Sequence, residues 1–229
     1  ALIVLIKSLS IELMISTLIS KPRPLSALLP SKLRYRYMSS ATKKVAVVLS
    51  GNGVFDGTEC TEGVATLVHL SRNGVEYNCY APDIEQMHAL DHTTGSEHAT
   101  NRNVLQESAR IARGNVQPLS KLVASSYHAL IIPGGFGAAK NLSSWAVDGP
   151  QASVQPDVAR VIRDFHDSDK VIGACCIAPT LLALTLKKDI EITVGMAEGD
   201  KWPYAGTANQ LADLGAVHKP CTIEEIAVD

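Results

Sequence analysis

The chain has 229 residues, 46% of them hydrophobic, and a formal net charge of −2. This length and content predict one sizeable folded domain, and the near-neutral charge argues against nucleic-acid binding as the main activity. Five cysteines without a C-x-x-C spacing predict neither a disulfide framework nor a zinc site, so a reducing compartment fits best.

The N-terminal segment differs in composition from the rest of the chain. Residues 1–42 hold six basic side chains against a single acid, Glu12, and are rich in Ser and Leu, as organelle transit peptides are. Lys7 and Glu12 interrupt the apolar runs, which argues against a membrane-spanning helix. Alternatively, translation starts at Met38 and the preceding residues are never made. We expect residues 43–229 to form the domain, in a mitochondrion or other organelle in the first case and in the cytoplasm in the second.

A strand–helix–strand unit opens this domain. Residues 45–49 are an apolar run that predicts a buried strand, ended by Gly51. A helix is predicted from Thr61 to a C-terminal Gly74, and Glu76–Ala81 predicts a second strand. Such units build parallel sheets.

The glycines after the first strand invite comparison with the dinucleotide-binding fingerprint G-x-G-x-x-G. Gly51 and Gly53 match its start, but Gly57 comes one residue too late. The acidic Asp56 and Glu59 also stand where a pyrophosphate would lie, and like charges repel. We therefore expect no nicotinamide or flavin cofactor.

Residues 82–101 form a long polar stretch with three histidines, and helices are predicted after it at 103–112 and 118–124. The irregular histidine spacing, with no cysteine nearby, does not predict a metal site. Loops of this length in compact domains are often functional, which makes His92 a candidate pocket residue.

His128–Ile132 predicts a strand that ends in the glycine-rich turn Pro133–Gly137. Backbone N–H groups are unobstructed there, and ligands of open α/β sheets bind at this end of the strands. A tight connection that needs positive φ is the alternative explanation. In the functional interpretation, Gly135 supplies one N–H group of an oxyanion hole, and Ile177, directly after Cys176, supplies the other.

The strongest local signal is a cysteine between a strand and a helix. Val171–Cys175 is apolar on both faces, as a central parallel strand is, and Pro179 fits a first helical turn. Cys176 lies between them, flanked by Ala174 and Ala178, and this spacing of small residues suits a strained strand-to-helix elbow. A helix N-terminus favours the thiolate, so Cys176 is predicted to be a nucleophile. Alternatively, the two cysteines are only small buried residues at a tight turn.

The remaining pattern continues the α/β alternation. An amphipathic helix is predicted over 156–167, a strand at 190–194 and a helix at 208–214. Residues 223–228 resemble the start of a strand. Because neither a hairpin nor a covering helix follows, we expect the domain to be incomplete at its C-terminus.

Together these motifs resemble the class I glutamine amidotransferase-like superfamily of PfpI and ThiJ proteins, and more narrowly the ElbB family and its mitochondrial amidotransferase-like relatives. The stretches that carry the resemblance are Leu49–Glu59, Arg102–Leu105, Pro133–Leu142, Cys176–Pro179 and Lys201–Thr207. The last of these matches the mitochondrial relatives only. The resemblance covers about residues 44–229 and implies a flavodoxin-like three-layer α/β sandwich with a mainly parallel sheet and a cysteine nucleophile elbow.

The resemblance also implies roles for particular residues. It makes Cys176 the nucleophile and places Glu62 where the superfamily has a glutamate that contacts the cysteine sulfur. An ordinary first-turn acid, favoured by the helix dipole, is the alternative for Glu62. Beside a thiolate, a partly desolvated carboxyl should be protonated and able to shuttle a proton. His92, Asn103 and Gly134 are expected to line the pocket, and a homodimer is expected from the resemblance alone.

One departure from the superfamily pattern limits the chemistry. Many members have a histidine just after the strand that follows the elbow, where this chain has Val194–Met196. Methionine cannot act as a base, so a Cys-His-acid triad, and with it amidotransferase or protease activity, is not expected. His218, beyond a further helix, is a weak substitute.

The leading functional hypothesis is a cofactor-independent, glyoxalase-like enzyme. Related superfamily proteins are associated with glutathione-independent conversion of glyoxal and methylglyoxal to hydroxy acids, which here would proceed through a hemithioacetal on Cys176. The rival hypothesis is a non-catalytic redox-sensing or interaction module, because an exposed, reactive cysteine oxidises selectively. We expect a small aldehyde as the binding partner, and no metal, nucleic acid or membrane.

Overall fold

The computed structural model describes residues 3–6, 43–99, 101–187, 190–196, 199, 206–222 and 224–229. Most of residues 1–42 therefore lie outside the described part of the chain. So do residues 201–205, within the stretch that carries the resemblance to the mitochondrial relatives.

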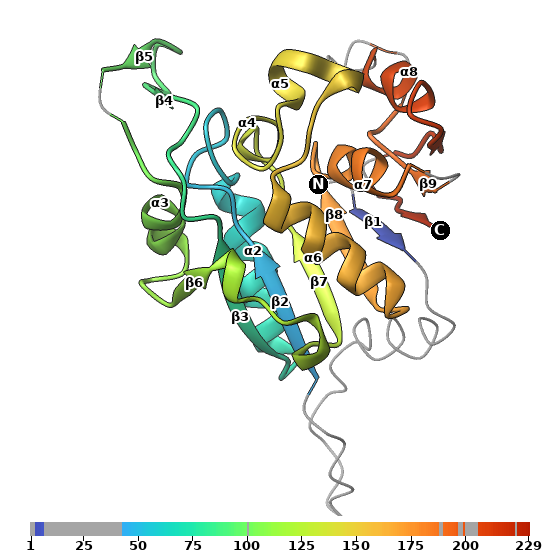
Figure 1. The fold of residues 1–229 in the computed structure, drawn as a ribbon, viewed down its shortest axis with the longest axis horizontal. Coiled ribbons are helices and arrows are strands. Elements are labelled where there is room, and N and C mark those ends of the chain that lie inside the picture. Colours follow the sequence, from blue (N-terminus) through green and yellow to red (C-terminus); the bar gives the residue numbers. More distant parts are fainter. Residues whose placement is uncertain are drawn as a thin grey trace, which may run out of the picture.

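A seven-stranded, mainly parallel sheet forms the centre of the protein (Figure 1). Its strands, in spatial order, are β11 (Ala227–Val228), β1 (Ile3–Ile6), β8 (Val171–Cys175), β7 (Ala129–Ile132), β2 (Lys44–Val48), β3 (Glu76–Ala81) and β6 (Val116–Pro118). Neighbouring strands pair in parallel except β1 and β8, which are antiparallel. The parallel pairing means that β2, β7 and β8 all end at the same edge of the sheet, where the glycine-rich turns and Cys176 follow.

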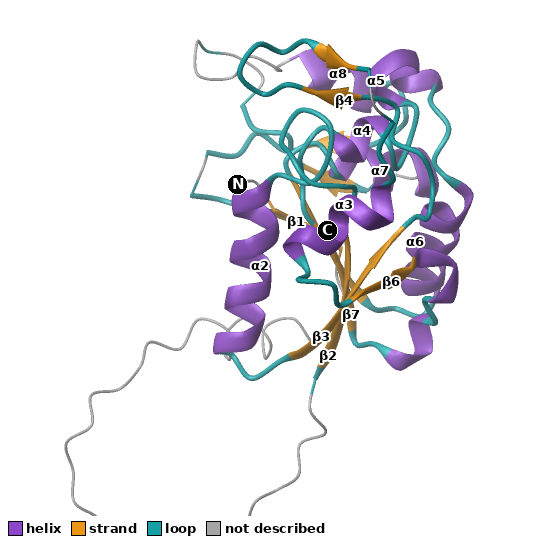
Figure 2. Cartoon of the chain, turned by 90° about the vertical axis from the view of Figure 1, so that its left-hand side faces the viewer, coloured by secondary structure: helices purple, strands orange, loops and turns teal. Residues whose placement is uncertain are grey.

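Helices cover both faces of this sheet, as Figure 2 shows. One face is covered by α2 (Cys60–Arg72) and α3 (Val104–Ile111), and the other by α6 (Pro156–Asp167) and α7 (Pro179–Leu186). The short helices α4 (Gly137–Lys140), α5 (Trp145–Asp148) and η3 (Gly149–Gln151) connect β7 to α6, and α8 (Gly206–Ala212) follows α7 in the chain. The predicted α/β three-layer sandwich is confirmed.

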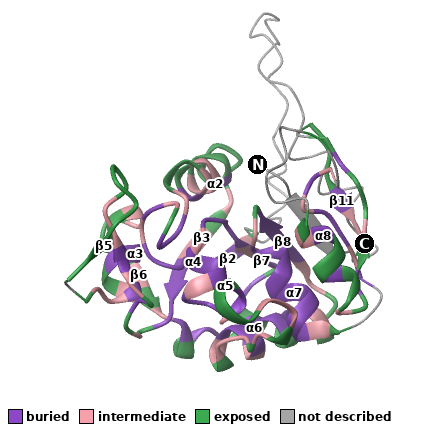
Figure 3. Cartoon of the chain, turned by 90° about the horizontal axis from the view of Figure 1, so that it is seen from above, coloured by how far each residue is buried: buried purple, intermediate pink, exposed green. Residues whose placement is uncertain are grey.

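The larger hydrophobic core lies on the α6 and α7 face, and its buried positions are purple in Figure 3. The inward residues of α6 recur at helical spacing: Val158, Val161, Ile162 and Phe165 are all at most 2% exposed. The strand side of this core includes Leu130 and Ile132. Burial of this stripe is what holds α6 against the sheet.

Two small ladders lie outside the main sheet. One joins β4 (Ala89–Leu90) and β5 (Glu97–His98) in antiparallel orientation, and the other joins β9 (Glu191–Ile192) and β10 (Val217–His218) in parallel. The predicted strand over 190–194 is therefore shorter than expected and does not join the central sheet. The Thr193 hydroxyl accepts a hydrogen bond from the Gly195 N–H group at 3.2 Å, a local turn that competes with continued pairing.

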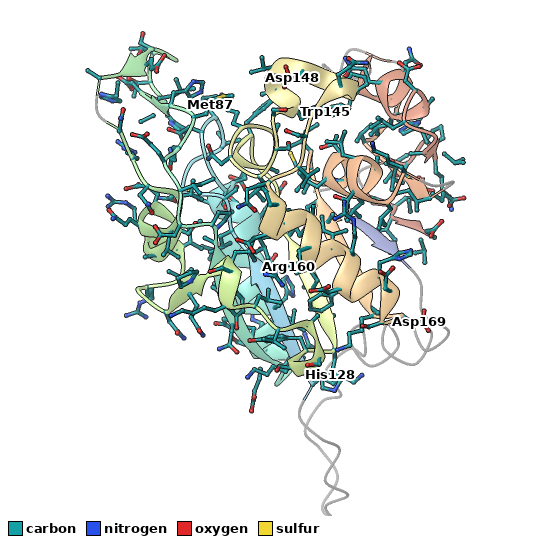
Figure 4. The ribbon with its side chains drawn as sticks, in the orientation of Figure 1. Met87, His128, Trp145, Asp148, Arg160 and Asp169 are labelled. Carbon is teal, nitrogen blue, oxygen red and sulfur yellow. The ribbon has the colours of Figure 1, made fainter. Side chains whose placement is uncertain are left out.

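The predicted helix over 118–124 is wrong. Two 3₁₀ turns occupy this region, η1 (Leu119–Lys121) and η2 (Ala124–Ser126), separated by extended backbone at Leu122. Leu119 and Leu122 are both buried, and their spacing of three residues suits a 3₁₀ turn as well as an α-helix. Arg160 of α6, labelled in Figure 4, donates hydrogen bonds to the carbonyls of both leucines at 3.2 Å. Those backbone acceptors are thus satisfied without a helix.

Strand β1 is a second difference from the sequence analysis, which leaves residues 1–42 out of the fold. The structure pairs Ile3 with Cys175 and Ile6 with Ile172, so β1 flanks the strand that leads to Cys176. Its other edge pairs with β11. None of the described helices has both the length and the apolar character that crossing a bilayer requires.

Candidate active site

The residue after β8 adopts the strained backbone of a sharp strand-to-helix elbow. Cys176 has φ +56°, a left-handed conformation that non-glycine residues rarely adopt. Ala174 and Ala178 on either side are fully buried, so larger side chains would not fit. Pro179 then begins α7, where its missing N–H group costs nothing. The sequence pattern thus produces the sharp strand-to-helix turn that it predicts.

The two adjacent cysteines have opposite surroundings. Cys175, the last residue of β8, is buried, and burial raises the pKa of its thiol to about 12. Cys176 is exposed. Only Cys176 therefore offers its sulfur to a ligand from solvent.

Two backbone N–H groups point at the Cys176 sulfur. Those of Gly135 and Ile177 hydrogen-bond the thiol and lower its pKa. Gly135 has φ +100°, and a side chain there would collide with the backbone of Gly57 and Glu59. The glycine-rich turn after β7 thus lies against the start of α2, with its N–H group beside the thiol.

The pKa of Cys176 is nevertheless raised, so the prediction that the elbow favours the thiolate is wrong. Desolvation by the surrounding atoms is the largest cause, and the negative charges of Glu62 and Glu59 add to it. These effects outweigh the two N–H donors. At neutral pH the sulfur therefore carries its proton, and a base must remove it before or during attack.

Glu62 is the candidate for that base. It lies in the first turn of α2, and its Oε2 accepts a hydrogen bond of 2.8 Å from the Gly134 N–H group. Burial is the main cause that raises its pKa, with the charge of Glu59 adding to the shift and the Gly134 hydrogen bond opposing it. Among the described side chains no hydrogen bond joins Glu62 to Cys176. Their interaction is electrostatic, since the charge of Glu62 raises the pKa of the thiol.

Gly134 is the residue over which the two groups converge. A methyl group there would lie 2.6 Å from Glu62 Oε2 and would overlap Cys176 Cβ. The absence of a side chain at this position is therefore what lets α2 and the elbow approach each other. That Gly134 also lines a ligand pocket stays a prediction.

Glu59 also contributes to this centre, although no sequence motif indicated it. Its side chain caps α2 by accepting a hydrogen bond of 2.7 Å from the Glu62 N–H group, and its own N–H group donates to the Gly134 carbonyl at 2.8 Å. Glutamate is not among the usual N-cap residues, so propensity alone does not point to it. Its position three residues before Glu62 is the available signal.

His92 and Asn103, by contrast, make structural contacts. The Nε2 atom of His92 accepts a hydrogen bond from the Phe55 N–H group at 3.3 Å, and its Nδ1 lies 3.1 Å from the Leu90 carbonyl. Asn103 caps α3 and donates to Asp83 at 2.9 Å. Among the described residues, neither hydrogen-bonds to Cys176 or Glu62.

His218 lies closer in space to Met196, where many superfamily members have a histidine, than its place in the sequence suggests. It pairs with Ile192 across the β9–β10 ladder, and its ring hydrogen-bonds the backbone of Gly195, directly before Met196. Burial lowers the pKa of His218. Its Nε2 atom is buried and has no hydrogen-bond partner among the described residues. Strand pairing brings it there, which the one-dimensional spacing could not reveal.

No three His, Cys, Asp or Glu side chains gather as metal ligands would within the described part of the chain. The arrangement that is present comprises a thiol, a carboxyl with a raised pKa and two convergent N–H donors. This set can add a sulfur to a carbonyl carbon, stabilise the resulting oxyanion and move a proton.

The sequence was compared with family models and with known proteins. No family model matches the chain. It is 52% identical over 221 residues to the rat "ES1 protein homolog, mitochondrial", covering 91% of this chain and 83% of the relative. It is 54% identical over 189 residues to the human "Glutamine amidotransferase-like class 1 domain-containing protein 3, mitochondrial", covering 81% and 70%.

A solved structure agrees with these sequence matches. The crystal structure of an isoprenoid biosynthesis protein with an amidotransferase-like domain from Ehrlichia chaffeensis is 33% identical, with a TM-score of 0.69. The match covers 78% of this chain and 79% of that one.

Proposed function

Because the chain belongs to the family of mitochondrial ES1 proteins and glutamine amidotransferase-like class 1 domain-containing proteins, we propose that it converts small dicarbonyls to hydroxy acids without a cofactor. Glyoxal and methylglyoxal are the expected substrates. The observation that carries the proposal is the convergence of the Cys176 thiol and the Glu62 carboxyl over Gly134, both with raised pKa values. Two such groups titrate as a coupled pair, and the carboxyl can pass a proton to a bound reactant.

The first step is addition of Cys176 to the aldehyde. A bond forms between sulfur and the aldehyde carbon, the carbonyl π bond breaks, and the thiol proton passes to Glu62. The oxygen becomes negative and is stabilised by the N–H groups of Gly135 and Ile177, which already face the sulfur. Loss of one such donor typically costs about 3 kcal/mol of transition-state stabilisation. Return of the proton to this oxygen gives the hemithioacetal.

The second step is a proton transfer between adjacent carbons. Glu62 removes the proton from the carbon bound to sulfur, forming an enediol, and delivers a proton to the neighbouring carbon. The product is a thioester of a 2-hydroxy acid, and water cleaves it to release the acid and the Cys176 thiol. One carbon is oxidised while its neighbour is reduced, so no external oxidant is needed.

Amidotransferase chemistry is less well supported. It needs a base beside the nucleophile, and Met196 cannot serve. Glu62 can serve as base for a dicarbonyl, because the acidic C–H bond of the hemithioacetal is on the carbon that carries sulfur, next to the remaining carbonyl. The relatives' names therefore indicate the family of this chain and do not define its reaction.

Location in mitochondria is also part of the proposal. Both mammalian relatives are named as mitochondrial proteins, and residues 1–42 have the basic, Ser- and Leu-rich composition of a transit peptide. Fusion of residues 1–42 to a fluorescent protein should direct it to mitochondria. Diffuse fluorescence would instead favour translation from Met38.

The decisive test of the activity uses purified protein and glyoxal without glutathione, with glycolate measured by NMR. Cys176→Ala and Glu62→Gln should each abolish turnover. Cys60→Ala is the matched control, because this thiol is also exposed but bonds to Asn52 Oδ1 at 3.1 Å, and it should keep full activity. Activity that persists in the Cys176→Ala protein would refute the mechanism.

A redox-sensing module is the second candidate, favoured by the exposure of Cys176 beside a carboxyl that can hydrogen-bond a sulfinic acid. The raised pKa of Cys176 counts against it, since the thiolate is the form that peroxide attacks. Mild peroxide treatment followed by peptide mass analysis separates the two. Rapid oxidation at Cys176 in a protein that does not turn over glyoxal would favour the sensor.

A further inference from the structure

A groove of about 660 Å³ lies on the face of the sheet that α2 and α3 cover, and its walls include none of Cys176, Glu62 and Gly135. It is bounded by residues of α2, β3, the end of α3 and the turn that follows α3. The outer side of α2 is largely exposed in Figure 3. Small-molecule sites typically measure about 300–1,000 Å³, so the groove is of suitable size.

The floor of the groove is apolar. Val64 and Val68, one helical turn apart on α2, are 47% and 40% exposed, and Leu67 and Ile111 complete the apolar surface. Residues four apart on a helix lie on one face, so the two valines form a continuous strip. Scattered single apolar residues need no explanation, but a strip inside a concavity marks a binding surface.

The rim of the groove is positively charged. Arg72, Arg110 and Arg113 line it, and no aspartate or glutamate does. Arg110 is already held by Glu107 through hydrogen bonds of 2.7 and 3.0 Å. Arg72 and Arg113 have no carboxylate partner among the described residues. Two guanidinium groups are thus available to an anion beside an apolar floor.

We propose that this groove binds a small amphipathic anion, namely a carboxylate or phosphate ester with an aliphatic or aromatic body. The body packs along Val64 and Val68, and the head group takes hydrogen bonds from Arg72 and Arg113, whose planar forks match carboxylate and phosphate oxygens. Charge complementarity selects this class over a neutral apolar molecule. The site is separate from the dicarbonyl chemistry proposed for Cys176.

The far end of the groove provides a direct readout of occupancy. Cys60, the first residue of α2, lines it together with Asn52, and its thiol is exposed. A molecule in the groove shields this thiol from alkylating reagents. Because burial and the charges of Glu59 and Asp56 raise the pKa of Cys60, alkylation is followed at about pH 9 and assigned to Cys60 by peptide mass analysis.

The probe is octyl phosphate, below its micelle concentration, with octanol and inorganic phosphate as its two separate halves. Octyl phosphate should bind by calorimetry and slow Cys60 alkylation at least fivefold, while either half alone should not. The double variant Arg72→Gln, Arg113→Gln should weaken binding about tenfold, a magnitude expected for losing two partly exposed charged hydrogen bonds. Val68→Asp should abolish binding.

Two controls keep the result specific. Arg163→Gln, on the exposed side of α6, makes the same change of charge outside the groove and should leave binding intact. Cys176→Ala should bind the probe as the wild type does, so loss of the proposed enzymatic activity and loss of this site are distinguishable.

Three results would overturn the proposal. Equal protection of Cys60 by octanol and by octyl phosphate would show that the anion is not recognised. Unchanged binding by the double arginine variant would show the same. The third result is a stable dimer in sedimentation, with Cys60 protected without any probe. That outcome would assign the groove to a second copy of this chain.

Discussion

Substitution Gly134→Ala tests the claim that the active site depends on a close approach over this residue. The added methyl group would overlap Cys176 Cβ and lie 2.6 Å from Glu62 Oε2, inside normal contact distance. Overpacking of this kind typically costs about 1–3 kcal/mol. Displacement of Glu62 also weakens its 2.8 Å hydrogen bond with the Gly134 N–H group, and hydrogen bonds to charged groups contribute about 1.5–3 kcal/mol.

We expect a loss of about 3 kcal/mol in the free energy of unfolding, since the two contributions overlap when Glu62 moves. At a urea m-value of about 1–3 kcal/mol/M, the unfolding midpoint falls by roughly 1–3 M. Gly206→Ala is the matched control, because a methyl group there meets nothing within 4 Å and the glycine begins a helix. Equal midpoints for the Gly134→Ala protein and the wild type would show that the approach of α2 to the elbow is not tight, and the site geometry would be refuted.

Three further predictions follow from the same contacts. Burial raises the pKa of Glu62 in the folded state, so its carboxyl stabilises the fold most when protonated. The wild type should therefore lose stability relative to Glu62→Gln as pH rises above about 4, the ordinary pKa of a glutamate. Urea titrations at several pH values measure this difference, and a constant difference would contradict the prediction. Asn141→Ala should cost about 2–4 kcal/mol in thermal or urea unfolding, because its amide donates to the buried carbonyls of Ser50 and Asp56 at 2.9 Å and both lose their partner. Asn103→Ala should cost about 1 kcal/mol as a lost helix cap and leave glyoxal turnover unchanged, whereas a large fall in turnover would return it to the pocket.

Local patterns were enough for much of the fold. Helix α6 and strands β3 and β8 lie at the residues predicted for them. Helix α6 has apolar residues at helical spacing, whereas the two strands are short segments bounded by turn residues. The elbow could also be predicted from the sequence, because small residues on both sides of Cys176 and a proline at the helix start are steric requirements of the turn itself. The helix predicted over 118–124 was wrong because a spacing of three residues between apolar side chains suits both α-helices and 3₁₀ turns.

The sequence by itself determined which residue would stand at the elbow, which glycine-rich turn would follow β7, and that Glu62 would lie in the first turn of the neighbouring helix. Only the tertiary structure decided the protonation of that cysteine. Its pKa depends on burial and on the charges of Glu62 and Glu59, which the parallel sheet brings beside it from more than a hundred residues away. The same holds for His218, which strand pairing places next to Gly195. Sterics act between neighbours in the chain and can be read from it, whereas desolvation and Coulomb interactions act between neighbours in space.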